Sequence, residues 1–193
     1  EIGVVIAYYN LIGGGKGNFD HKSNLENCNV EPCQLGSTFI FRNCVFSKVL
    51  VGAIDVYRGG NDESTTGPCF IMDHCTFNEV GNVELCSVVR LTGVQFSSIT
   101  NCIFYNSGRS GRTVKYEDYG WTKNKISYCN NFIAGRIESF YNNVKGKSML
   151  AYDPVFENSA ANDFRLKSHS PLRKKANDGK DMGAIYQNGQ LKL

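Results

Sequence analysis

The sequence predicts an all-β fold, a right-handed parallel β-helix (solenoid) with an irregular C-terminal closing segment. The first observation is a short apolar phrase, built around one Cys and one Phe, that occurs four times. The second is its period: Cys44, Cys75, Cys102 and Cys129 lie 31, 27 and 27 residues apart, an interval typical of solenoids. The third is that each copy is too short for a helix and rich in β-forming residues, so the stacked units should be strands.

The four copies predict which side chains stack inside the solenoid. Three of them read Phe41-Arg42-Asn43-Cys44-Val45-Phe46, Met72-Asp73-His74-Cys75-Thr76-Phe77 and Ile99-Thr100-Asn101-Cys102-Ile103-Phe104. The fourth copy, residues 126–132, has one extra residue before Phe132. With rungs about 4.8 Å apart, each Cys and each Phe is expected to lie above its counterpart in an internal ladder. An antiparallel sandwich is the alternative, but it requires turn signals every ~8–12 residues and gives no reason for this longer interval.

The domain organisation follows from the same repeat. Residues 1–193 are expected to form one β-helix domain, with a first coil at 1–38, repeated coils at 39–150 and a closing segment at 151–193. The closing segment should cover apolar interior and unpaired strand edge at the solenoid end. The chain begins as if a strand were already under way, at 1–9, with no initiator Met and no signal sequence. We therefore expect the C-terminal part of a longer chain.

The chain has eight cysteines, and we expect them to be buried free thiols rather than a disulfide framework. The four repeat cysteines suit a packed stack, where a small apolar side chain fits. Cys69 and Cys86 lie outside the repeat, and Cys28 and Cys33 could pair, although nothing in the sequence requires it. The absence of a C-x-x-C pair and the scattered His residues make a zinc site a weak prediction. The sequence leaves any metal ligand unknown.

The charge pattern excludes some partners. The formal net charge of +3 is too small to indicate a polyanion partner by itself, and no repeat position interleaves Arg with aromatic residues as a nucleic-acid groove does. No apolar run is long enough to span a membrane. A basic excess lies near the C-terminus, in Arg165, Lys167, Arg173, Lys174, Lys175 and Lys180. Such a run is usually solvated surface, and contact with a polyanion is the alternative.

The candidate binding residues lie in the phrase that runs from Tyr57 to Pro68. Arg58, Asp62 and Glu63 provide a cation and two carboxylates, which together with Tyr57 and Asn61 could bind a sugar acid or, through oxygen atoms, calcium. The structural alternative is a corner in which two glycines supply positive φ and Asn61 and Asp62 hydrogen-bond the local backbone. Arg58 would then pair with Asp62 or Glu63.

Several phrases resemble the C-terminal β-helix domain of family six polysaccharide lyases, the group that contains chondroitinase B and the alginate lyases. The narrowest is the phrase from Tyr57 to Pro68, together with Leu91-Thr92-Gly93-Val94-Gln95. The ending is similar to the closing segment of many bacterial β-helix carbohydrate enzymes, in the phrases at 153–156, 163–166, 170–172 and 181–184. The resemblance covers roughly residues 39–185.

The resemblance implies β-elimination on an acidic, alginate-like polysaccharide by a periplasmic or extracellular enzyme. In the family, calcium commonly neutralises the uronate carboxylate, a Lys abstracts the C5 proton and an Arg assists the leaving group. Those residues lie on an N-terminal β-helix, in Glu-Gly-Glu and Arg-His-Gly phrases that this chain lacks; Val83-Glu84-Leu85 is not the acidic pair. The chain is thus expected to have no catalytic residues and no evident cofactor. Its roles would be stability, contact in a possible homodimer, or extension of the groove of an N-terminal catalytic domain.

Two alternatives stay open. One is a free-standing carbohydrate-binding β-helix module with no lyase partner. The other is an enzyme in its own right that uses Arg58 with Lys115 or Lys123. Substrate identity, alginate or glycosaminoglycan, is not determined by the sequence.

Overall fold

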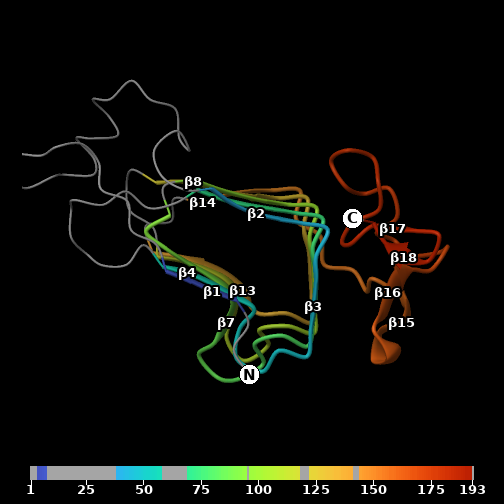
Figure 1. Cartoon of the computed structure of the whole chain (residues 1–193), viewed down its shortest axis with the longest axis horizontal. Coiled ribbons are helices and arrows are strands. Elements are labelled where there is room, and N and C mark those ends of the chain that lie inside the picture. Colours follow the sequence, from blue (N-terminus) through green and yellow to red (C-terminus); the bar gives the residue numbers. More distant parts are fainter. Residues whose placement is uncertain are drawn as a thin grey trace, which may run out of the picture.

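The computed structural model describes residues 4–7, 38–57, 69–94, 96–117, 122–140 and 144–192. Within these residues the chain winds through three parallel sheets that enclose a triangular interior, as Figure 1 shows. Each strand pairs with the corresponding strand of the next coil, and all of these pairings are parallel. The predicted all-β parallel solenoid is confirmed. No helix in the described residues is both long and apolar enough to cross a membrane.

The three sheets take their strands in turn along the chain. Sheet 1 contains β1 (Val4–Ala7), β4 (Ile54–Tyr57), β7 (Ser87–Thr92), β10 (Arg112–Glu117) and β13 (Arg136–Ser139). Sheet 2 contains β2 (Thr38–Arg42), β5 (Cys69–Asp73), β8 (Phe96–Thr100), β11 (Lys123–Ser127) and β14 (Val144–Lys147). Sheet 3 contains β3 (Val45–Ser47), β6 (Thr76–Asn78), β9 (Ile103–Tyr105) and β12 (Asn130–Phe132).

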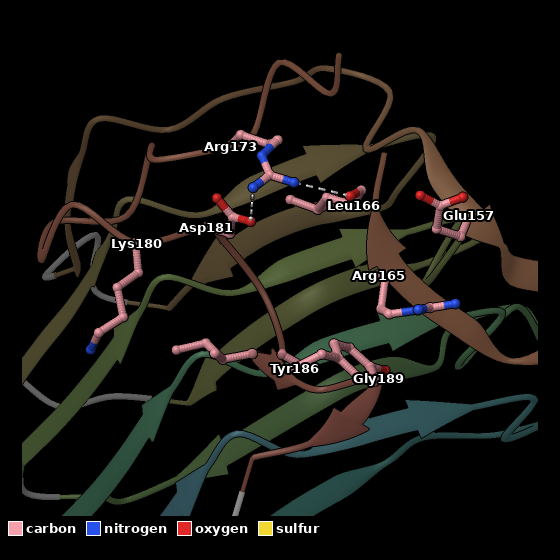
Figure 2. A pocket seen from close by; sticks show the side chains of 10 residues that line it. Glu157, Arg165, Leu166, Arg173, Lys180, Asp181, Tyr186 and Gly189 are labelled. Atoms are coloured by element: carbon pink, nitrogen blue, oxygen red, sulfur yellow. Dashed lines mark hydrogen bonds and ion pairs between the residues drawn. The ribbon is translucent and has the colours of Figure 1, made fainter. Parts of the chain in front are cut away.

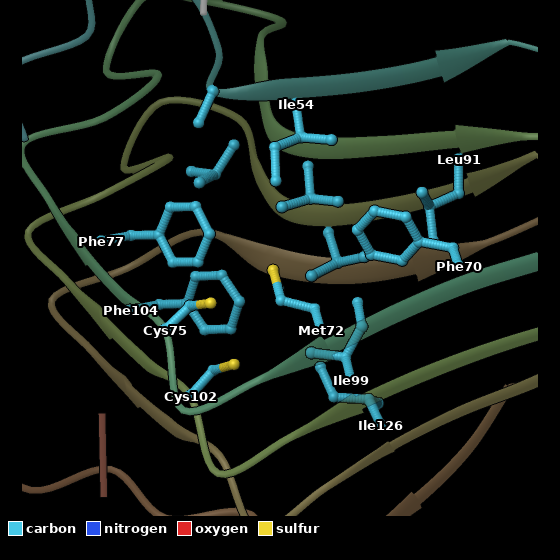
Figure 3. Close-up of a cluster of buried hydrophobic side chains, with 14 of the residues drawn as sticks. Ile54, Phe70, Met72, Cys75, Phe77, Leu91, Ile99, Cys102, Phe104 and Ile126 are labelled. Carbon is cyan, nitrogen blue, oxygen red and sulfur yellow. The ribbon is translucent and has the colours of Figure 1, made fainter. Parts of the chain in front are cut away.

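The interior is filled by aliphatic and aromatic side chains stacked from coil to coil (Figure 3). The register places Phe41, Met72, Ile99 and Ile126 above one another, which is the order the repeated phrase predicts. Met72, Ile99 and Ile126 are all buried. One coil could not bury these residues alone, so the core exists only because the coils stack.

The predicted Phe ladder forms for three of the four copies. The rings of Phe46 and Phe77, and of Phe77 and Phe104, stack with centroids 4.9 Å apart, close to the spacing of the strands. The prediction is wrong for Phe132. The extra residue in the fourth copy places Asn131 beside Phe104 and moves Phe132 beside Tyr105 on the other face of the sheet. Because side chains alternate between faces, one inserted residue reverses the direction of the ring.

The residue before each repeat Cys forms the corner between sheets 2 and 3. Asn43, His74, Asn101 and Tyr128 all have left-handed backbone, with φ of 52°, 49°, 56° and 51°. Asn adopts this conformation more readily than most residues, which explains its place in two of the copies. The backbone ladder continues through the corner; for example, the His74 amide donates to the Thr100 carbonyl at 3.2 Å.

The repeat cysteines line the inside of this corner. Cys75, Cys102 and Cys129 are buried free thiols, as predicted, and each donates to the carbonyl two residues earlier, at 3.4, 3.0 and 3.3 Å. Burial raises the pKa of the Cys102 thiol, so this thiol stays protonated at neutral pH. Cys44 is also free. It lies between β2 and β3, the strands at one end of sheets 2 and 3, and is half-buried.

The expectation of free thiols is wrong at Cys69. This buried residue, the first of β5, is disulfide-bonded. Cys86 is free and half-buried. The possible pairing of Cys28 with Cys33 also falls outside the described residues.

The C-terminal segment forms a second layer along the outer face of sheet 3 (Figure 1). Its elements are β15 (Phe156–Asn158), the short 3₁₀ helix η1 (Ser159–Ala161), β16 (Asp163–Leu166), β17 (Tyr186–Gln187) and β18 (Gln190–Leu191). The two strand pairs, β15–β16 and β17–β18, are antiparallel. A second apolar core joins this layer to the solenoid. Its buried members are Ile103, Phe156, Phe164, Leu172, Ala176 and Met182.

The corner residues hold this layer in place. Asn43 exchanges hydrogen bonds with the Ile185 backbone, and Asn101 accepts from the Asn177 amide at 2.9 Å. His74 lies between the Gly183 carbonyl, 3.1 Å from Nδ1, and Asp178, 3.3 Å from Nε2. Gly183 passes so close that a Cβ there would lie 2.6 Å from the Thr76 hydroxyl. The contacts run along the side of the solenoid across successive coils, so the segment covers a flank of the stack.

We predict that the two faces of sheet 3 respond differently to loss of an aromatic ring. Phe104→Ala removes an interior ring that is fully buried and should lower the free energy of unfolding by about 3–5 kcal/mol. Phe132→Ala removes a half-buried ring stacked on Tyr105 at 6.3 Å and should cost about 1 kcal/mol. Denaturant unfolding of both variants checks this. Equal losses would contradict the assignment of Phe132 to the outer face.

We also predict a graded reactivity of the thiols. Native alkylation followed by peptide mapping should label half-buried Cys86 well before Cys75, Cys102 and Cys129, which are fully buried. In denaturant, all four cysteines should be alkylated at similar rates. Rapid labelling of the three buried cysteines in the native state would contradict the internal ladder.

Candidate functional site

Most of the residues that the sequence singles out for sugar binding fall outside the described chain. Arg58, Asn61, Asp62 and Glu63 are among these, and their prediction stays untested. Tyr57 is the last residue of β4, where its backbone pairs with Thr92 of β7. Thr92 in turn pairs with Glu117 of β10. The phrase from Tyr57 to Pro68 therefore begins in the row of paired residues of sheet 1 that contains the charged Glu117.

The outer face of sheet 1 presents a row of charged side chains across the coils. In β4, β7 and β10 a charged residue stands between two buried apolar ones, as in Val89-Arg90-Leu91. The register places Asp55 beside Arg90, Arg90 beside Lys115, and Lys115 beside Glu138. Because successive side chains alternate, burial of the apolar neighbours directs the charged ones outward.

Arg90 is the centre of this row. Its guanidinium lies 3.2 Å from Glu117 Oε2 and 3.7 Å from Asp55 Oδ2, so it connects two neighbouring coils. Glu117 also binds the Lys115 ammonium and accepts the Thr92 hydroxyl at 3.0 Å. We call Asp55, Arg90, Thr92, Lys115 and Glu117 the charged row. Glu138, with Arg112 at 2.7 Å and Arg136 at 2.6 Å, continues it onto the next coil.

The two carboxylates of the charged row have opposite pKa shifts. Partial burial raises the pKa of Glu117, but hydrogen bonds from Lys115, Arg90 and Thr92 outweigh it and lower the pKa to about 2. Burial raises the pKa of Asp55, and the nearby Arg90 opposes that rise only in part. Asp55 Oδ1 is buried and accepts no hydrogen bond in the structure. Because this oxygen is buried, a ligand at the surface can reach only the exposed part of the Asp55 side chain, which is 38% exposed.

The row is better arranged for binding than for proton abstraction. A lysine that acts as a base must present a free Nζ to the substrate proton, whereas the Lys115 Nζ is engaged in an ion pair with Glu117. Lys123, the other candidate base, is exposed at the start of β11 in sheet 2. The structure thus places Lys115 and Lys123 on different sheets, while Arg58 lies outside the described residues.

The structure brings three of the basic residues near the C-terminus to one pocket. Arg165, Arg173 and Lys180 line one pocket of about 480 Å³ within the C-terminal layer (Figure 2). Lys174 and Lys175 are exposed and do not line it. In the described part of the chain, no group of three or more His, Cys, Asp and Glu side chains is placed to hold a metal ion.

The sequence interpretation did not identify the charged row. The available signal was a charged residue between apolar neighbours, as in Ile54-Asp55-Val56, Val89-Arg90-Leu91 and Val114-Lys115-Tyr116. The spacing of these triplets is uneven because the connections between coils differ in length, so only the strand register shows that they share one row.

We predict that Glu117 contributes to stability at neutral pH and that this contribution is lost in acid. Its pKa in the folded state is below the ordinary value of 4.5, so the contribution is complete above that pH and disappears as the pH falls towards about 2. Glu117→Gln should cost about 1 kcal/mol at pH 7 and reduce the acid dependence of unfolding. Glu84→Gln, an exposed control, should leave that dependence unchanged. Parallel pH profiles for wild type and Glu117→Gln would contradict the ion network.

The comparison with protein families places this solenoid in a group without a defined function. A family model described as "Domain of unknown function (DUF5123)" matches residues 70–180, which include the charged row from Arg90 onward and much of the C-terminal layer. Among curated proteins, no match to the chain is found. The family match gives no assignment to the polysaccharide lyases. The match extends over more than half of the sequence, and the chain therefore belongs to the DUF5123 family.

Proposed function

We propose that this chain is a non-catalytic domain that binds acidic polysaccharide along the outer face of sheet 1. The charged row is the observation that supports this proposal. It crosses three neighbouring coils at right angles to the strands, from Asp55 through Arg90 to Lys115. An extended polymer lying along the row would meet one charged side chain at each strand spacing of about 4.8 Å.

The chemistry of the row fits a uronate polymer. A guanidinium can bind a carboxylate through two parallel hydrogen bonds, and Arg90 is held at the surface by Asp55 and Glu117. Sugar hydroxyl groups can donate to the exposed part of the Asp55 carboxylate, whose side chain is 38% exposed. Carboxylate and hydroxyl groups on adjacent positions are characteristic of a uronic acid residue. The ligand class is therefore an acidic polysaccharide of the alginate or glycosaminoglycan kind.

The row lacks the groups for β-elimination. The ion pair of Lys115 opposes a role as base, and the oxygens of Glu117 are bound by Lys115, Arg90 and Thr92. Because cations already contact both Asp55 and Glu117, the described residues of this face do not fit a calcium site. We assign any lyase chemistry to an N-terminal domain of a longer, secreted, alginate-lyase-like protein. A possible homodimer contact belongs to the same proposal.

A free-standing carbohydrate-binding module would use the same face. The two possibilities differ in what accompanies the domain, since a lyase requires Glu-Gly-Glu, Lys and Arg-His-Gly phrases elsewhere in the same protein. Sequencing of the complete gene distinguishes them, whereas binding by the 193-residue chain supports both.

We predict that the chain binds alginate and that Arg90 is required. In affinity electrophoresis with soluble alginate at low salt, Arg90→Gln should weaken binding about tenfold, the loss of one charge-assisted contact. Arg109→Gln, which removes an exposed cation from the turn before β10, should bind like wild type. Added salt should weaken all binding. A neutral glucan retarding the chain as strongly as alginate, or equal binding by the two variants, would contradict the proposal.

The same protein preparation tests for catalysis. Incubation with alginate or chondroitin and calcium should produce no increase in the ultraviolet absorbance of unsaturated uronates. An increase that Lys115→Gln abolishes would show that the chain is itself a lyase and would refute the non-catalytic assignment.

A further inference from the structure

A second polar site lies in the C-terminal layer, which packs on the outer face of sheet 3. Figure 2 shows an open pocket bordered by β15, β16, the turns that follow and the β17–β18 hairpin. Its volume of about 480 Å³ is in the range of pockets that hold one small ligand. All of its lining residues come from positions 157–189, so it is built separately from the charged row of sheet 1.

The lining contains more cationic than anionic side chains. Arg165, Arg173 and Lys180 supply three cations to the lining, and Glu157 and Asp181 supply two carboxylates. Two of the cations are oriented by carboxylates that do not line the pocket. Asp163 accepts from Arg165 Nε at 2.8 Å, and Asp178 accepts from Lys180 Nζ at 2.6 Å.

Arg173 is the cation best placed to take a ligand. Its contacts are long, an ion pair of 3.6 Å with Asp181 and a hydrogen bond of 3.4 Å to the Leu166 carbonyl. Close hydrogen bonds of a guanidinium lie near 2.7–3.0 Å, so these contacts orient Arg173 without saturating its five N–H donors. In Figure 2 its guanidinium lies between Asp181 and Leu166, at the wall of the pocket.

The remaining walls suit the ring of a sugar. Tyr186 is half-buried, and Leu166, Ala184 and Ile185 add apolar surface. The Tyr186 phenol is an uncharged donor and acceptor at neutral pH, and burial raises its pKa further above the ordinary value of 10.0. Glu157 and Asp181 can accept hydrogen bonds from ring hydroxyl groups. The pocket therefore combines a cation for a carboxylate, acceptors for hydroxyls and an apolar wall.

We propose that this pocket binds a single sugar acid, a uronate monosaccharide or chain end, with the carboxylate on Arg173. The inference rests on the proposed function for the class of ligand, but it concerns different residues. The charged row would hold the body of a polymer, whereas the pocket would hold one terminal residue.

The test is calorimetric titration of the 193-residue chain at low salt with D-glucuronate and with D-glucose, which differ only at C6. Saturable binding of glucuronate and none of glucose is expected. Arg173→Gln should weaken glucuronate binding about tenfold, as loss of a bidentate contact would. Lys180→Gln, which leaves the contacts of Arg173 in place, should weaken it as well. Lys175→Gln, an exposed cation outside the pocket, should match wild type. Absence of binding, equal binding of glucose, or wild-type affinity in both pocket variants would overturn the inference.

Arg90→Gln separates this inference from the proposed function. The variant should bind alginate about tenfold more weakly and keep the glucuronate affinity of wild type. If Arg90→Gln abolishes glucuronate binding and Arg173→Gln does not, the pocket inference is wrong and the proposed function stands. If glucuronate binding depends on Arg173 but alginate is not retained, the proposed function fails and the pocket remains a site for small uronates.

Discussion

In-register pairing of parallel strands between successive coils is the constraint on which this structure depends. It places each residue at the strand spacing from its counterpart, so the same position must carry a compatible side chain in every coil. Inside the solenoid the result is the stack of Phe46, Phe77 and Phe104. Outside, the same register aligns Asp55 with Arg90 and generates the charged row. The core and the candidate binding surface are thus two consequences of one repeat.

The parts of the fold that repeat could be predicted from the sequence, and the parts that break the repeat could not. Three copies of the Cys-Phe phrase have the predicted register, since their spacing is constant within the strands. Phe132 was misplaced because a single inserted residue reverses its face. Cys69 gave no sign of its disulfide, as it lies outside the phrase. The basic residues were the only sign of the pocket in the sequence. The turns that bring them together have no repeated sequence pattern from which their positions could be predicted.

The two candidate sites use charge in the same way. In each, an arginine is oriented by acidic neighbours rather than left to move freely: Arg90 by Asp55 and Glu117, and Arg173 by Asp181. A cation oriented in advance loses less conformational entropy when it meets a carboxylate. The formal net charge of +3 therefore understates how well the surface is prepared for an anion, because opposite charges cancel in the sum while their geometry remains.

The contact between the C-terminal layer and the corner residues has a consequence for the order of assembly. Asn43 hydrogen-bonds to Ile185, so one of the earliest described coils is joined to a residue 142 positions later. The coils themselves need only their neighbours and can stack while the chain is being synthesised. The flank can close only after residue 185 has been made. Because the coils can be stacked by then, the C-terminal layer docks onto a flank that is already formed, and its contacts with Asn43, His74 and Asn101 join several coils.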